Sequence, residues 1–254
     1  MKVFKFMMFA FFLGATAMTT TAQSEAELYK LGMKYKKDVD NVKLLQVFKK
    51  LVEMKPENAD YLAHMSFGYS KVGANLADEK LQLKYYAKAK EVGAKAKKID
   101  DKSAFAHYSY ALALARENEN AATKVKIENA KEIKKECEIS MKLDPSIAGN
   151  YHIMARWHRT FAGLSNMKSA MINTFYGGTP EGGTYKDALE MFQKAIELEP
   201  WYMLHVYELA VTYQEMKQND LAKKYVEKAM ELSQSYEDAK ICYKKCETLL
   251  AELK

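Results

Sequence analysis

Residue types that could carry chemistry are few in this chain of 254 residues. The five histidines form no HExxH motif, and no CxxC pair is present to complete a zinc site. The sequence also contains no P-loop, no GxGxxG motif and no GxSxG motif. We therefore expect no catalytic residue, no metal and no cofactor, and we expect that the protein is not an enzyme.

Two further groups allow a chemical and a structural interpretation. Asp100 and Asp101 could hold a metal, but they stand at a predicted helix end, where carboxylates usually cap helices or form turns. Cys242 and Cys246 lie one helical turn apart, and the odd total of three cysteines argues against a disulfide framework. We interpret both groups as structural.

The arginines form the one distinctive pattern. The chain has 39 cationic residues, of which only Arg116, Arg156 and Arg159 are arginine. His152, Arg156 and Arg159 follow one another at i, i+4 and i+7, so they share one stripe of a helix. The planar guanidinium matches a carboxylate or phosphate, which predicts an anion-binding point. The alternative is that these arginines pair with glutamates of adjacent helices or stack on aromatic rings.

The elements that must position these side chains are helical repeats. In the segment 184–200, TYKDALEMFQKAIELEP, Ala188, Phe192 and Ala195 share a helix face, and Pro200 ends the helix. This is the second half of a tetratricopeptide (TPR) helix pair, whose period is ~34 residues. The sequence therefore predicts an all-α TPR solenoid of about five helix pairs with a C-terminal capping helix.

We place the predicted repeats at residues 25–58, 59–103, 104–147, 148–202 and 203–236, with the cap at 237–253. Together they form a single domain over 23–254. The second and third repeats exceed the template, and we expect their extra residues to lengthen helices. The fourth repeat carries an insert at 163–183, with a short amphipathic helix at 166–175 followed by a glycine-rich loop.

In such a solenoid certain slots of each first helix face a concave groove. The candidate binding residues at these slots are Arg156, Arg159, His152, Arg116, Tyr108, Leu112, Tyr207, Phe67 and Tyr29. An arginine cluster in an aromatic groove suits an acidic or C-terminal carboxylate peptide, or a lipid head group.

The N-terminus has the layout of a signal peptide. Lys2 and Lys5 precede an apolar run at 6–17, and Thr20-Thr21-Ala22 offers a small-residue cleavage site. We expect cleavage after residue 22 and export to the periplasm or medium; the alternative is an uncleaved N-terminal membrane anchor. Without the two lysines the net charge falls from +6 to +4, which is too mild to indicate nucleic acid. We expect no transmembrane segment in the mature chain.

A more specific resemblance lies in the fourth repeat. It is carried by Ala155-Arg156-Trp157, Leu164-Ser165, Phe175-Tyr176-Gly177, Pro180 and Thr184-Tyr185 leading into ALEMFQKAIELEP. This pattern resembles the regulator of microtubule dynamics family, most clearly over residues 103–232. The resemblance implies a non-enzymatic TPR domain. It also implies an association with microtubules and mitochondria, as in animal members, and, for one membrane-anchored member, lipid transfer at organelle contacts.

Two functions remain open from the sequence. The first is a non-enzymatic scaffold or adaptor that binds a protein or peptide partner in its concave groove. The second is a carrier of a lipid or another amphipathic anionic small molecule. The scaffold predicts a shallow, open groove, whereas the carrier predicts a deep apolar cavity with a basic mouth.

Overall fold

The computed structural model describes residues 24–176, 178 and 182–253, so the predicted signal peptide lies outside the described residues. Over the described part the chain forms twelve α-helices and no strand. Their bounds are α1 Glu25–Lys37, α2 Asn41–Met54, α3 Ala59–Gly73, α4 Glu79–Ile99, α5 Ala104–Asn118, α6 Thr123–Leu143, α7 Ala148–Ala162, α8 Asn166–Tyr176, α9 Tyr185–Leu198, α10 Met203–Glu215, α11 Asn219–Met230 and α12 Glu237–Glu252. The prediction of an all-α fold is confirmed.

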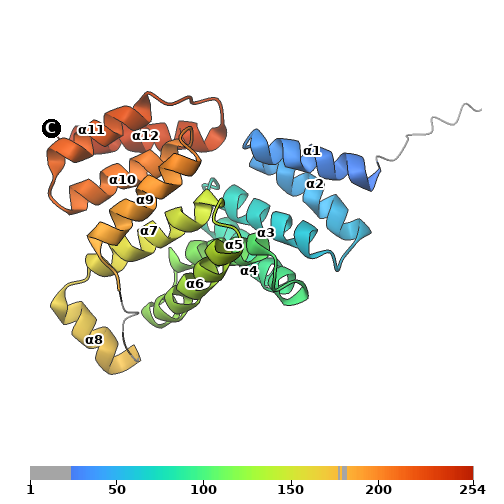
Figure 1. Cartoon of the computed structure of the whole chain (residues 1–254), viewed down its shortest axis with the longest axis horizontal. Coiled ribbons are helices and arrows are strands. Elements are labelled where there is room, and N and C mark those ends of the chain that lie inside the picture. The colour runs from blue at the N-terminus through green and yellow to red at the C-terminus, as the bar shows by residue number, and fades with distance from the viewer. Residues whose placement is uncertain (1–23, 177, 179–181, 254) are drawn as a thin grey trace, which may run out of the picture.

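The helices pair in the order that the repeats predict. The hairpins are α1–α2, α3–α4, α5–α6, α7–α9 and α10–α11, and α12 packs on α10 and α11 (Figure 1). First helices also pack on one another, α3 on α5, α5 on α7 and α7 on α10, which builds the solenoid. The helix predicted within the insert is α8, which projects beyond the α7–α9 hairpin (Figure 1).

The extra residues of repeats two and three lengthen helices, as expected. The second helices α4 and α6 each have 21 residues, whereas α2 in the uninterrupted first repeat has 14. Both longer helices extend at their N-terminal ends, before the stripe that packs in the repeat. Helices of this length remain regular because good helix formers such as lysine and glutamate fill their solvent-exposed faces.

Small residues at matching positions of each repeat hold its two helices together. Ala188, Phe192 and Ala195 are fully buried in α9. In the first repeat, a Cβ atom added to Gly32 would lie 2.7 Å from the ring of Phe48, so the close approach of α1 and α2 requires glycine there. The repeat pattern is therefore a packing pattern: one large ring fills the space that the small residues leave.

The two ends of the solenoid meet (Figure 1). The carboxylate of Asp238, at the start of α12, accepts hydrogen bonds from Lys71 and Asn75 at 2.6 and 2.8 Å. It also accepts bonds from Tyr202 at 2.9 Å and Asn41 at 3.3 Å. We call these five residues the Asp238 clasp. The clasp ties α2 and α3 to the last repeat, and so closes one side of the concave surface.

No helix in the described ranges is long and apolar enough to cross a membrane.

Candidate binding groove

A groove of about 750 Å³ lies on the concave side, where the first helices of successive repeats face one another. Its aromatic lining residues are Tyr29, Phe67, Phe105, Tyr108, Trp201 and Tyr202. The volume falls within the roughly 300–1,000 Å³ of ordinary ligand sites. The groove is thus large enough to hold part of a ligand, such as a few residues of an extended peptide.

One wall is a continuous aromatic surface. The ring of Phe67 lies 5.8 Å from that of Phe105 and 6.2 Å from that of Tyr108, and Phe105 lies 5.6 Å from Tyr108. Because α3 supplies the first ring and α5 the other two, the wall exists only when the second and third repeats are stacked. Such a wall offers large apolar area with little side-chain entropy to lose on binding.

Charges of both signs line the same groove. The cations are Lys36, Lys37, Lys71 and Arg116, and the acids are Asp60, Asp144 and Glu199. Lys71 is neutralised by the Asp238 clasp at 2.6 Å, and Arg116 by Glu119 at 2.8 Å. The lining therefore offers both donors and acceptors, and it is not a basic mouth.

Lys36 has no such carboxylate within 4.0 Å among the described residues. Its Nζ donates to Nε2 of His64 at 3.3 Å and lies 3.6 Å from the centre of the Phe105 ring. Nδ1 of His64 donates in turn to the Asp60 carbonyl at 2.9 Å, with the Asp60 carboxylate 3.3 Å away. Burial lowers the pKa of Lys36 to about 8, although Asp60 and Glu199 oppose the shift.

Two further histidines meet at the other side of the groove. Nδ1 of His152 and Nδ1 of His205 are 2.8 Å apart, and Nε2 of His205 lies 3.2 Å from Glu199. Burial lowers the pKa of both histidines, that of His152 well below its usual value, so both are neutral at pH 7. When His205 donates through Nε2 to Glu199, its Nδ1 accepts, and His152 is the donor of the shared bond.

The arginines form a ladder of alternating charge. Arg116 pairs with Glu119 at 2.8 Å, and Glu119 lies 3.4 Å from Arg156. Arg156 lies 4.0 Å from Glu208, which binds Arg159 at 2.6 Å. A last contact of 3.3 Å joins Arg159 to the carboxylate of Glu215. The ladder runs from α5 across α7 to α10, so each guanidinium already has a carboxylate partner on its own helix or a neighbouring one.

The structure brings together only some of the candidate binding residues. Those that line the groove are Tyr29, Phe67, Tyr108, Leu112, Arg116 and His152. Arg156, Arg159 and Tyr207 are not among its lining residues. A binding role for the arginines stays a prediction, and the ladder gives each of them a structural role as well.

Several groove residues escaped the sequence reasoning. Lys36, His64, Phe105 and His205 line the groove but carry no motif. Lys36, His64 and His205 fall at the same spacings as core residues, which the repeat pattern cannot separate from groove residues. Nothing in the sequence distinguishes Lys36 from the surface lysines, since it too has a carboxylate residue, Asp40, at i+4.

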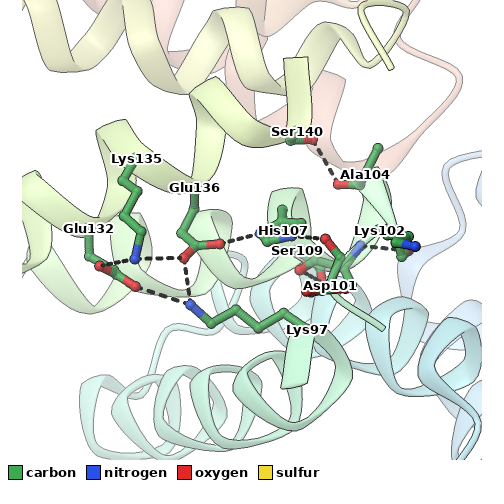
Figure 2. A network of polar contacts seen from close by, with 12 residues as sticks. Lys97, Asp101, Lys102, Ala104, His107, Ser109, Glu132, Lys135, Glu136 and Ser140 are labelled. Carbon is green, nitrogen blue, oxygen red and sulfur yellow. Dashed lines mark hydrogen bonds and ion pairs between the residues drawn. The ribbon is translucent and has the colours of Figure 1, made fainter. Parts of the chain in front are cut away.

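A second polar cluster lies away from the groove, between α4, α5 and α6 (Figure 2). The carboxylate of Glu136 is 1% exposed and accepts hydrogen bonds from His107 and Lys97. Nε2 of His107 also donates, at 2.9 Å, to the carbonyl of Asp101. The bond to Glu136 raises the pKa of His107. Because the carboxylate is buried and already accepts hydrogen bonds from both neighbours, we interpret the cluster as a structural contact that holds the repeats together.

No group of three or more histidine, cysteine, aspartate or glutamate side chains is placed to hold a metal in the described part of the chain. The three cysteines are buried as free thiols.

Comparison with known proteins places the chain. The model of the family "Regulator of microtubule dynamics protein 1-3" matches residues 26–254. The chain belongs to this family. The mouse regulator of microtubule dynamics protein 1 is 30% identical over 169 residues, which cover 66% of this chain and 54% of that protein. The rat regulator of microtubule dynamics protein 3 is 28% identical over 176 residues, which cover 68% and 37%.

The match covers only part of the length of these relatives, and a solved structure supports the fold independently. The chain spans about half the length of the curated family members of type 1 that it matches. Among solved structures, a thermophilic TPR protein of Thermus thermophilus has a TM-score of 0.63 at 14% identity, with 88% of this chain and 98% of that chain covered. This likeness shows that the fold is a TPR solenoid.

Proposed function

We propose that this family member is a binding scaffold whose concave groove holds an extended peptide segment of a protein partner. The observation that carries the proposal is the lining of the groove. An aromatic wall stands beside Lys36, Asp60 and Glu199, so that apolar contacts and both kinds of hydrogen-bonding group occur within one cavity. A peptide backbone presents donors and acceptors in equal number, and its side chains supply the apolar part.

The same lining argues against a dedicated acyl-chain site. A lipid chain has no hydrogen-bonding group, so it would remove water from the charged side chains of Lys36, Asp60 and Glu199 and offer nothing in its place. A lipid-carrier function, and the microtubule association that the relatives' name implies, are alternatives that experiment can test. Export of the mature chain by its N-terminal segment is likewise a proposal of ours.

The test is a selection of random twelve-residue peptides displayed on phage against the chain 24–254. Two variants then report on the site: Trp201→Ala and Leu204→Glu change groove-lining side chains at the start of the last repeat. Leu83→Ala is the matched control, since Leu83 is a large exposed side chain on α4, a helix that supplies no residue to the groove. We expect selected peptides to lose about tenfold or more in affinity for the two groove variants and to bind the control normally.

Two results would count against the proposal. Selection that yields no peptide above background would show that the groove does not recognise peptides. Peptides that bind the groove variants and the control equally would place recognition elsewhere. Native mass spectrometry of the gently purified chain tests the lipid alternative, because a reproducible adduct of lipid mass would favour a carrier.

A further inference from the structure

We propose that the side-chain amine of Lys36 is a carbonyl-reactive site, which condenses with small apolar aldehydes that enter the groove. The inference does not rest on the proposed function, because it concerns one amine and needs no protein partner. It starts from a contrast within the groove. Lys71 and Arg116 are held in ion pairs, whereas Nζ of Lys36 contacts an imidazole nitrogen and an aromatic ring face.

The neighbours of Lys36 give a route for its proton. Nδ1 of His64 faces the carbonyl and the carboxylate of Asp60, so the hydrogen of the neutral ring lies on Nδ1 and the lone pair of Nε2 faces Lys36. Burial lowers the pKa of His64, which keeps the ring neutral and able to accept. The His64 ring is fixed between Phe48 at 4.5 Å and Phe105 at 4.3 Å, so this acceptor is held in place.

The surroundings also lower the pKa of Lys36, so that its ammonium loses a proton more readily. The charges that act on it are Asp60 from α3 and Glu199 from the segment after α9, and Lys37 of its own helix lines the same groove. The two carboxylates favour the ammonium, but burial outweighs them and sets the pKa of Lys36 at about 8. A lysine of ordinary pKa, ~10.4, is far less often neutral at pH 7.5. The face of Phe105 stabilises the ammonium and the protonated imine alike.

The chemistry balances without an added oxidant or reductant. The neutral amine attacks the aldehyde carbon, an N–C bond forms, and the carbonyl electrons move to oxygen, which takes up the proton that nitrogen gives up. The hydroxyl of this carbinolamine then takes up a proton from solvent and leaves as water, which breaks the C–O bond and gives a protonated imine. The imine returns that proton to neutral His64 or to solvent. The net change is amine plus aldehyde to imine plus water. The apolar part of the aldehyde would lie against Phe67 and Tyr108, and the acids favour a reagent without negative charge.

The experiment uses benzaldehyde with cyanoborohydride, which traps each imine as a stable secondary amine. The chain 24–254 is treated for a series of short times at pH 7.5, and the labelled lysines are quantified by peptide mapping. Lys30 is the internal control, because it lies exposed on the same helix. We expect Lys36 to be labelled at least about tenfold faster than Lys30, since more of its amine is neutral at this pH.

Two variants sharpen the result. Lys36→Arg keeps the positive charge and removes the nucleophile, so the fast phase should disappear while slow labelling of the surface continues. His64→Gln should slow the labelling of Lys36 several-fold and leave that of Lys30 unchanged. Labelling of Lys36 no faster than Lys30 in the wild-type chain would overturn the inference. A different lysine that is labelled as fast as Lys36 in the wild type, and remains so in Lys36→Arg, would overturn it as well, because Lys36 would then have no special reactivity.

Discussion

The Asp238 clasp offers the sharpest test of how this solenoid is held in shape. Asp238→Asn keeps the size of the side chain and removes its charge. The carboxylate and its partner Lys71 are only 10% and 11% exposed. Burial alone would raise the pKa of Asp238, but the charge of Lys71 and the hydrogen bonds from Asn75 and Tyr202 outweigh it and lower the pKa to about 2.

The size of the effect follows from that pKa. A shift from 3.8 to about 2, at 1.36 kcal/mol per pKa unit, corresponds to about 2–3 kcal/mol of unfolding free energy. This contribution is fully present above the unfolded pKa of 3.8 and is lost as the pH falls through about 2. We therefore expect Asp238→Asn to lower the unfolding free energy by about 2–3 kcal/mol at pH 7, and by progressively less below pH 4.

The assay is urea unfolding followed by circular dichroism at pH 7 and pH 3. Asp220→Asn is the matched control, because Asp220 is also the second residue of its helix but is exposed. Its removal should change stability by less than about 1 kcal/mol, the usual value of a charge near a helix end. Equal losses for the two variants at pH 7, or a loss for Asp238→Asn that does not shrink at low pH, would refute the ion-pair account of the clasp.

Three further predictions concern other ties between repeats. Because the folded pKa of His107 is raised, its contribution should be complete below its unfolded pKa of about 6.5 and fade as the pH rises through the folded value; urea unfolding of wild type and His107→Gln from pH 6 to 9 measures the convergence. Arg159→Met leaves the buried carboxylate of Glu208 without its 2.6 Å partner and should destabilise by about 3–5 kcal/mol, against little change for the exposed Lys30→Met. Gly149→Ala would drive a Cβ atom into the hydroxyl of Tyr108, and we expect it to lower the unfolding free energy by about 1–3 kcal/mol in urea; an unfolding free energy equal to that of wild type would show that this contact is not tight.

The repeats could be predicted from the sequence because their pattern lies within single helices. Slots such as Ala188, Phe192 and Ala195 recur within one helix, and the same few spacings predict both the helix and the face that it buries. The extra length of α4 and α6 could be predicted for the same reason, since those segments keep the composition of helices.

The charge pairs between repeats could not be predicted in this way. Lys71 meets Asp238, and Arg159 meets Glu208, only because of the curvature with which successive repeats stack. That curvature is the sum of small rotations at each interface, and no single interface reveals it in the sequence. The arginine stripe was therefore visible as a pattern, while the carboxylates that face it were not. For the same reason the half-buried Lys36 looked like any lysine of a solvated helix.

The measurement that tests the central claim most directly is a map of where a selected peptide binds. A peptide from the display selection, synthesised with a benzophenone side chain, is irradiated with the chain 24–254, and the cross-linked residues are identified by mass spectrometry. We predict cross-links to Phe67, Phe105 and Leu204, on the concave side. Cross-links confined to the outer helices α4, α6 and α9 would contradict the account, because the partner would then bind the convex surface and the groove would have another purpose.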